Sequence, residues 1–201
     1  MPRRRPLPLL LIVVALLTAC SQDNERPSVQ VSPQKSDIQV RMEQVASNPR
    51  DADAWFHLAE LYDGAGMYPE EIDALKKVIA LKPKEIGYAY EQLGTTYNRI
   101  GKYREAVGSF LKAKEHSPKN PVIYNNLAAS YGMLGKTNEQ ISALEKAVAL
   151  RPHYATARYN LGIVFLKKGN RTEALKQYQE LNKFDEGTAQ VLKKEIDAKG
   201  K

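Results

Sequence analysis

Small and hydrophobic residues in the body of the chain follow the period of helices that come in pairs. In each unit a leucine, a small residue and an aromatic residue stand at positions i, i+1 and i+4, on one face of a helix. A glycine follows four residues later, where a left-handed backbone would end that helix. A second apolar-periodic stretch comes next, and in most units a proline blocks its continuation. The pattern therefore predicts two antiparallel helices in each unit.

The same unit occurs four times in register. Its glycines lie 35, 34 and 34 residues apart, and the leucines and aromatics keep the same spacing. The recurring positions are Leu58, Leu93, Leu127 and Leu161; Tyr62, Tyr97, Tyr131 and Phe165; Gly66, Gly101, Gly135 and Gly169; and Pro83, Pro118 and Pro152. A single helix pair cannot bury its apolar face, so we expect the four pairs to stack side by side.

These positions resemble the tetratricopeptide repeat (TPR) family, whose unit is a helix pair of about 34 residues. The resemblance implies an all-α fold, a right-handed α-α superhelix (TPR solenoid) of four helix pairs with flanking capping helices. Within a domain of residues 36–201, we expect a cap helix at 36–48, repeats at 52–85, 87–120, 121–154 and 155–188, and a C-terminal cap at 188–198. Ile86 is a one-residue insertion, and the first cap has its apolar positions at Ile38, Met42 and Val45.

Three positions depart from the pattern of the family. Glu71 and Gln140 stand where the repeat prefers alanine, so we expect looser packing inside the first and third repeats. Glu186 replaces the proline that would end the fourth repeat, so we expect this repeat to continue into the tail.

The N-terminus has the layout of a secretory signal. Three arginines precede an apolar run from Leu7 to Leu17. Eleven helical residues span roughly 16 Å, about half of the ~30 Å hydrocarbon core, so a transmembrane anchor is the weaker interpretation. Residues 1–19 are therefore interpreted as a signal peptide that is removed.

The end of this segment, Leu17-Thr18-Ala19-Cys20, resembles the lipobox of bacterial lipoproteins. The resemblance implies cleavage before Cys20 and diacylation of its thiol, which would hold the protein on a bilayer. The alternative is a plain signal peptide followed by a chance cysteine. Residues 20–35 are polar and lack a period, so we expect a lipid-anchored flexible linker. In this family Ser21, rather than aspartate, indicates the periplasmic face of the outer membrane if the organism has two membranes.

Charge and cysteine content narrow the classes of partner. The 201 residues have a formal net charge of +7; without the first nineteen, 27 basic and 23 acidic residues leave +4, weak ground for a nucleic-acid partner. A single cysteine excludes an internal disulfide framework and any multi-cysteine metal site.

No arrangement of residues in the sequence predicts catalysis. His57, His116 and His153 fall at different phases of different repeats, and no pair has the i, i+4 spacing of a metal site. Ser109 and Lys112 match a Ser-x-x-Lys string, but the other strings of the enzymes that use it are missing. We therefore expect no metal, no cofactor and no enzymatic activity.

The TPR resemblance implies a groove lined by the first helix of each pair, at the second, fifth, ninth and twelfth positions of the repeat. Along it the residues would change from acidic, through amide and aromatic, to apolar. The candidate partner-binding residues are Phe56, Glu60, Tyr88, Glu91, Asn98, Asn125, Ala129, Tyr159, Ile163 and Leu166. The alternative for each of them is a contact with the neighbouring repeat or with the C-terminal cap.

Two functions remain open from the sequence. The first is a non-enzymatic, lipid-anchored scaffold of the cell envelope that binds a peptide or helix of an envelope protein. A narrower form of it resembles the pilotins, lipoproteins that help pilus or secretion pores assemble. The second is a protein that binds or processes cell-wall glycan, with carboxylates from Asp53, Glu60, Asp63 and Glu91. Because function follows sites rather than folds, the missing catalytic set favours the scaffold.

Overall fold

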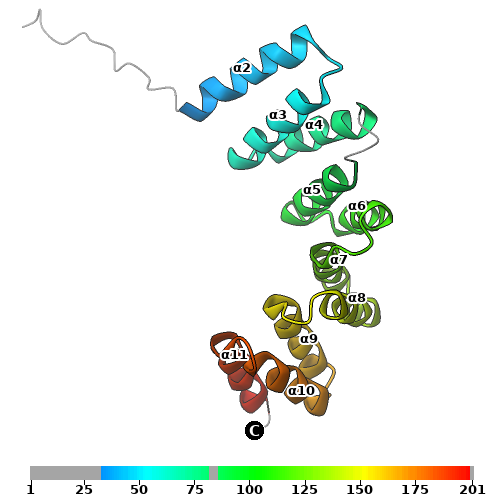
Figure 1. Ribbon diagram of the computed structural model, residues 1–201, viewed down its shortest axis with the longest axis vertical. Helices are drawn as coiled ribbons and strands as arrows, with labels where there is room; N and C mark the ends of the chain where they lie inside the picture. Colours follow the sequence, from blue (N-terminus) through cyan, green and yellow to red (C-terminus); the bar gives the residue numbers. More distant parts are fainter. Residues whose placement is uncertain (1–32, 82–85, 200–201) are drawn as a thin grey trace, which may run out of the picture. The chain divides into compact units, whose positions relative to one another are not determined.

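The computed structural model of the chain describes residues 33–81 and 86–199. Within these residues there are ten α-helices and no strand (Figure 1). The helices are α2 (Pro33–Ser47), α3 (Ala52–Gly64), α4 (Tyr68–Leu81), α5 (Ile86–Arg99), α6 (Tyr103–His116), α7 (Pro121–Met133), α8 (Thr137–Leu150), α9 (Ala155–Lys167), α10 (Arg171–Asn182) and α11 (Glu186–Ala198). None of these described helices is long and apolar enough to cross a membrane. The signal peptide, Cys20 and Pro83 lie outside the described residues.

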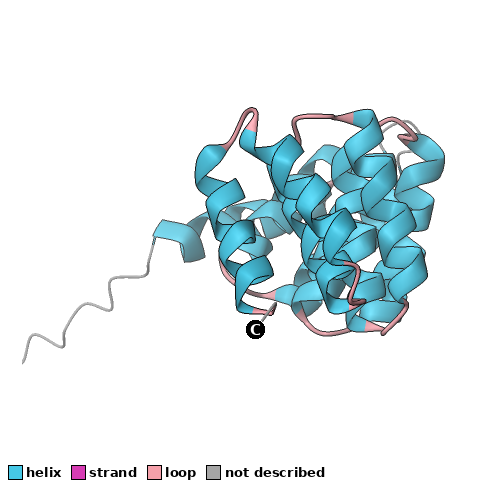
Figure 2. Ribbon diagram, turned by 90° about the horizontal axis from the view of Figure 1, so that it is seen from below, coloured by secondary structure: helices cyan, strands magenta, loops and turns pink. Residues whose placement is uncertain are grey.

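Helices α3 to α10 form four consecutive antiparallel pairs, and each pair packs against the next pair along the chain. In the middle of the stack, α5 and α7 lie on one side and α6 and α8 on the other (Figure 1). Figure 2 shows the helices side by side, with the connecting loops gathered at their two ends. The predicted all-α fold of four helix pairs with flanking helices is thereby confirmed.

The turn inside each pair is built on the predicted glycine. Gly66, Gly101, Gly135 and Gly169 have φ between 70° and 76°, in the left-handed region that favours glycine. The N–H of the following residue donates to the carbonyl of the aromatic residue of the same repeat, the bond that marks a Schellman motif. These bonds join Met67 to Tyr62, Lys102 to Tyr97, Lys136 to Tyr131 and Asn170 to Phe165, over 2.8–2.9 Å. The glycines therefore end the first helices as predicted.

The repeated leucine and small residue form the core of the stack. Each of the four leucines is at most 5% exposed. A Cβ added at Gly94 would lie 2.8 Å from the ring of Phe110 in α6, which is fully buried. The lack of a side chain at Gly94 therefore allows α5 and α6 to approach each other closely.

The N-terminal cap helix differs from its prediction in two respects. It begins at Pro33, inside the stretch expected to be a flexible linker. Proline fits there because the first turn of a helix does not use the N–H that proline lacks. Ile38 and Val45 are buried, but Met42 is 49% exposed, so its assignment to the apolar face is wrong. A terminal helix has repeats on one side only, which leaves the edge of its apolar stripe in solvent.

The C-terminal cap helix α11 starts at Glu186, two residues before its predicted start. Asp185 caps it, because its carboxylate accepts the N–H of Thr188 at 2.9 Å. Since α10 ends at Asn182, the expectation that the fourth repeat continues into the tail is wrong. An aspartate cap separates the two helices where the proline is missing.

Candidate functional site

The predicted groove residues all lie on α3, α5, α7 and α9, whose surface we name the first-helix face. Two aromatic rings from consecutive repeats meet on it: the ring centroids of Phe56 and Tyr88 are 5.5 Å apart. Phe56 is half-buried, whereas Tyr88 is 51% exposed. A partly exposed aromatic pair at the junction of two repeats offers a rigid contact area to a partner.

The acidic end of this face contains three carboxylates with different surroundings. Glu60 is exposed, and Nδ1 of His57 lies 3.0 Å from one of its oxygens. Asp63 forms an ion pair with Arg99 of the next repeat. Glu91 accepts a hydrogen bond from Nδ2 of Asn120 at 2.9 Å; burial raises its pKa, against the smaller opposite effect of this bond. Of the carboxylates considered for glycan chemistry, Asp63 therefore links the first two repeats, and Glu91 joins α5 to the residue that caps α7.

The predicted amides on this face are engaged between repeats. The hydroxyl of Ser130 donates to Oδ1 of Asn98 at 2.9 Å, and Nδ2 of Asn160 donates to Oδ1 of Asn125 at 3.2 Å. Asn125 is buried, and Asn98 is half-buried. At these two positions the structure shows the alternative that the sequence leaves open, a contact with the neighbouring repeat. On α7, the exposed candidate is Ala129.

The apolar end of the first-helix face packs against the C-terminal cap. Tyr159, Ile163 and Leu166 belong to a hydrophobic cluster that also contains Leu192 and Ile196 of α11. Leu166 is buried, and the other two predicted residues are half-buried. The protein's own last helix therefore covers much of the apolar surface that the sequence assigns to a partner.

Phe56 and Glu60 border a cavity of about 210 Å³, which we name the repeat-one pocket. Its lining residues are Phe56, Ala59, Glu60, Asp63, Glu71, Leu75 and Gln92. Glu71 comes from the second helix of the pair and is only 4% exposed. Its Oε1 accepts a hydrogen bond from the hydroxyl of Thr96 at 2.6 Å, while Oε2 has no partner among the described residues. Burial raises the pKa of Glu71, and the bond from Thr96 opposes this shift only in part.

The third repeat has a cavity of about 180 Å³ at the matching place, which we name the repeat-three pocket. It is lined by Ala128, Ala129, Gln140, Leu144, Asn160, Ile163, Val164 and Lys167. Gln140 holds the position of Glu71, and its amide lies 2.6 Å from where a Cβ of Gly132 would stand. Both pockets thus occur in the repeats where a large polar side chain replaces alanine.

Family profiles of the tetratricopeptide repeat match the chain in four places. A TPR repeat profile matches residues 133–169, and tetratricopeptide repeat profiles match residues 43–86, 89–122 and 156–185. The chain is a tetratricopeptide repeat protein. Members of this family are typically non-enzymatic scaffolds for protein–protein interaction. None of the curated proteins compared with the chain matches it.

Solved structures of other TPR proteins have the same fold. The crystal structure of MamA superposes with a TM-score of 0.73 at 23% identity, over 78% of this chain and 91% of MamA. MamA from Desulfovibrio magneticus RS-1 gives 0.71 at 18% identity, over 88% of this chain and 92% of that one. YrrB, described as a TPR protein with an unusual peptide-binding site, gives 0.69 at 20% identity, over 80% of this chain and 84% of YrrB. At these identities the likeness shows the fold alone.

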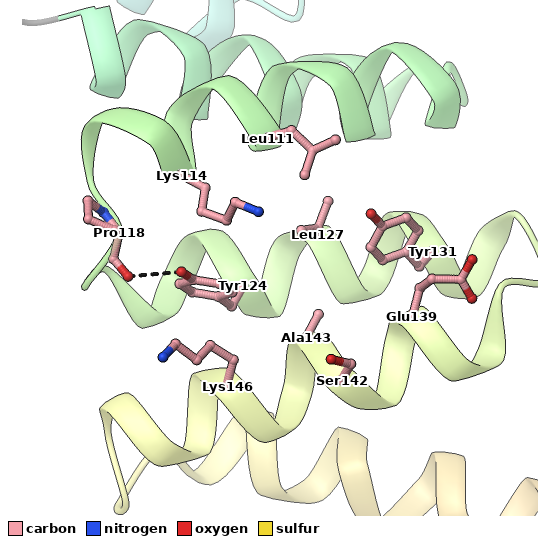
Figure 3. A pocket seen from close by; sticks show the side chains of 10 residues that line it. All are labelled: Leu111, Lys114, Pro118, Tyr124, Leu127, Tyr131, Glu139, Ser142, Ala143 and Lys146. Carbon is pink, nitrogen blue, oxygen red and sulfur yellow. Dashed lines mark hydrogen bonds between the residues drawn. The ribbon is translucent and has the colours of Figure 1, made fainter.

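A larger cavity of this TPR protein, about 470 Å³, lies among α6, α7 and α8 and contains none of the predicted groove residues. Figure 3 shows Lys114 and Lys146 toward one end of it and Tyr131 and Glu139 toward the other. Near the lysines, the hydroxyl of Tyr124 donates to the carbonyl of Pro118 at 2.9 Å. In the sequence these residues fit the packing positions of the repeats, and no pattern indicates a cavity among them.

Sequence reasoning also missed the pocket residues of the TPR domain that come from second helices. Glu71 and Gln140 line the two pockets, and their departure from alanine was the available signal. Gln92 and Asn160 complete the walls from the next repeat, where no pattern singles them out. Within residues 33–81 and 86–199, no group of three or more histidine, cysteine, aspartate or glutamate residues is placed to hold a metal ion.

Proposed function

We propose that the chain is a lipid-anchored scaffold of the bacterial cell envelope, which binds a peptide or helix of an envelope protein on its first-helix face. The observation that carries the proposal is the aromatic pair at a repeat junction, in which the exposed Tyr88 packs on the half-buried Phe56 beside the acidic Glu60. Aromatic anchors of this kind supply much of the energy of protein interfaces. The peptide-binding site described for YrrB, a protein of the same fold, supports a peptide as the ligand.

The location in this proposal rests on the sequence around Cys20, which is outside the described residues. The lipobox-like Leu17-Thr18-Ala19-Cys20 supports a diacylated cysteine, and Ser21 supports the periplasmic face of the outer membrane. A polar stretch then links the anchor to the repeats. In this position the protein would hold its partner close to the membrane, as an assembly factor of the pilotin type does.

Replacing the acylated residue tests the location. We expect the wild-type protein in the membrane fraction, beginning at Cys20 and with the added mass of its acyl chains. The Cys20→Ser variant should lose that mass, remain uncut and no longer be sorted with the outer membrane. Crosslinking in the same cells should join the wild type to a defined envelope protein and join Cys20→Ser to it less.

A wild-type chain with an unmodified cysteine, free in the soluble fraction, would contradict the location. It would leave the binding role of the first-helix face open, because that role depends on the repeats and not on the anchor.

A further inference from the structure

The repeat-one pocket combines acidic side chains with a buried acceptor that lacks a donor. Glu60 and Asp63 border the pocket, and Glu71, 4% exposed, forms part of its wall. Among the described residues, Oε2 of Glu71 has no hydrogen-bond partner. A buried oxygen without a donor loses its hydration and gains nothing in return, so the pocket is incomplete as it stands.

The charged groups around this pocket leave Glu71 without a cation. Arg99 pairs with Asp63, and His57 lies against Glu60. Thr96 supplies a neutral hydroxyl to Oε1 of Glu71, and no ion pair to Glu71 occurs within residues 33–81 and 86–199. A positively charged donor from outside would therefore find an uncompensated carboxyl group.

The size and walls of the pocket limit what can enter. A volume of about 210 Å³ is below the 300–1,000 Å³ or so of small-molecule pockets, so it suits one side chain rather than a whole ligand. Phe56 lines the pocket, and the ring of Tyr88 lies beside that of Phe56, 5.5 Å between centroids. Aromatic faces pack on the aliphatic stem of a basic side chain and attract its charge.

The repeat-three pocket provides a comparison within the same molecule. There the neutral Gln140 replaces Glu71, Val164 takes the position of Thr96, and Lys167 borders the cavity. That pocket therefore has no reason to prefer a cation. Of the two pockets, only the repeat-one pocket should therefore prefer a cation.

We propose that the repeat-one pocket seats one basic side chain, arginine or lysine, of the segment that binds the first-helix face. The cationic group lies beside the carboxylate of Glu60 while its stem packs on Phe56, and the side chain of Glu71 turns its buried Oε2 toward the cation to accept a hydrogen bond. This assignment rests on the proposed function and adds to it the chemistry of one partner residue.

A small cation tests the pocket without knowledge of the partner. Butylguanidinium is titrated into the full-length protein while NMR follows the side-chain carboxyl signal of Glu71, with neutral butylurea as the matched probe. We expect saturable binding of butylguanidinium in the millimolar range, and a fall in the pKa of Glu71 as the cation binds. Glu71→Gln should weaken this binding about tenfold or more, and Glu60→Gln, at an exposed position, should weaken it less.

The control variant is Gln140→Glu, which alters the matching position of the repeat-three pocket. It should leave binding at the repeat-one pocket unchanged. Equal binding of butylguanidinium to the wild type and to Glu71→Gln, equal binding of butylurea, or no saturable shift up to tens of millimolar would overturn the proposal.

The same experiment separates this proposal from the scaffold role. Binding of butylguanidinium as expected, with no envelope protein crosslinked to the first-helix face, would support the pocket and refute the scaffold. A partner that crosslinks to this face and binds Glu71→Gln with undiminished strength would overturn the pocket and leave the scaffold standing.

Discussion

Glu71 is a carboxyl group enclosed between the first two repeats, with one oxygen bonded to Thr96 and the other without a described partner. Because burial raises its pKa, the folded protein holds the proton of this group more tightly than the unfolded chain does. The stability that results is fully present below the unfolded pKa of 4.5. It is lost as the pH rises through the folded pKa.

We therefore predict that Glu71→Gln removes one source of pH dependence. The free energy of unfolding of the variant should match that of the wild type near pH 4 and exceed it by roughly 1 kcal/mol near pH 7. Urea denaturation at a series of pH values measures this difference. Glu91, whose pKa is also raised by burial, is present in both proteins, so its contribution to the pH dependence cancels in the difference. A difference that stays constant with pH, or a variant less stable at neutral pH, would contradict this account.

Because α5 and α6 approach closely at Gly94 but nothing packs on Gly108, alanine should have opposite effects at these two glycines. A Cβ at Gly94 would lie 2.8–2.9 Å from three ring carbons of Phe110, whereas a Cβ at Gly108 would meet no atom within 4 Å. Gly94→Ala should cost about 1–2 kcal/mol, since overpacking exceeds the gain in helix propensity. Gly108→Ala, in the exposed middle of α6, should stabilise by about 0.5–1 kcal/mol. Thermal unfolding of both variants checks the sign; a stabilising Gly94→Ala would count against the packing described here.

The C-terminal cap offers a second matched pair in neighbouring residues of α11. Leu192 is fully buried and would lie 2.7 Å from a Cβ placed on Gly162 of α9, whereas Val191 is 49% exposed. Leu192→Ala should lower the free energy of unfolding by about 2–5 kcal/mol, and Val191→Ala should change it by less than about 0.5 kcal/mol. Hydrogen exchange should show the loss concentrated in α9, α10 and α11. Equal effects of the two substitutions would mean that α11 does not cap the stack through Leu192.

The elements were predictable from the sequence because the leucine, small, aromatic and glycine positions recur in all four repeats and the proline recurs in three. The ends of the helices were less predictable. Pro33 and Asp185 set the starts of α2 and α11 through local capping, and the spacing of the repeats carries no information about such caps. Contacts between repeats could not be predicted, since the bond from Asn160 to Asn125 spans 35 residues and depends on the exact register of packed helices. Glu71 and Gln140 predicted looser packing in the first and third repeats, where the two pockets lie, but the pocket walls were not predictable because they also depend on side chains from the next repeat.

At the scale of the whole molecule, the four repeats divide the candidate groove between partner binding and internal packing. The junction of the first two repeats keeps an exposed aromatic ring and an acidic pocket. The middle amides join repeat to repeat, and the last helix covers the apolar end. The groove residues proposed from the sequence therefore separate into an open N-terminal part and a C-terminal part that stabilises the stack.

Site-specific crosslinking in cells tests most directly whether a protein partner binds the first-helix face. A photo-reactive amino acid is placed at Tyr88, at Ala129 or at Ser142 in cells that make the protein; the first two are exposed on that face, and the third lines the larger cavity. We predict that Tyr88 and Ala129 crosslink to the same envelope protein, Tyr88 more strongly, and that Ser142 does not. Crosslinks from Ser142, with none from Tyr88 or Ala129, would contradict it.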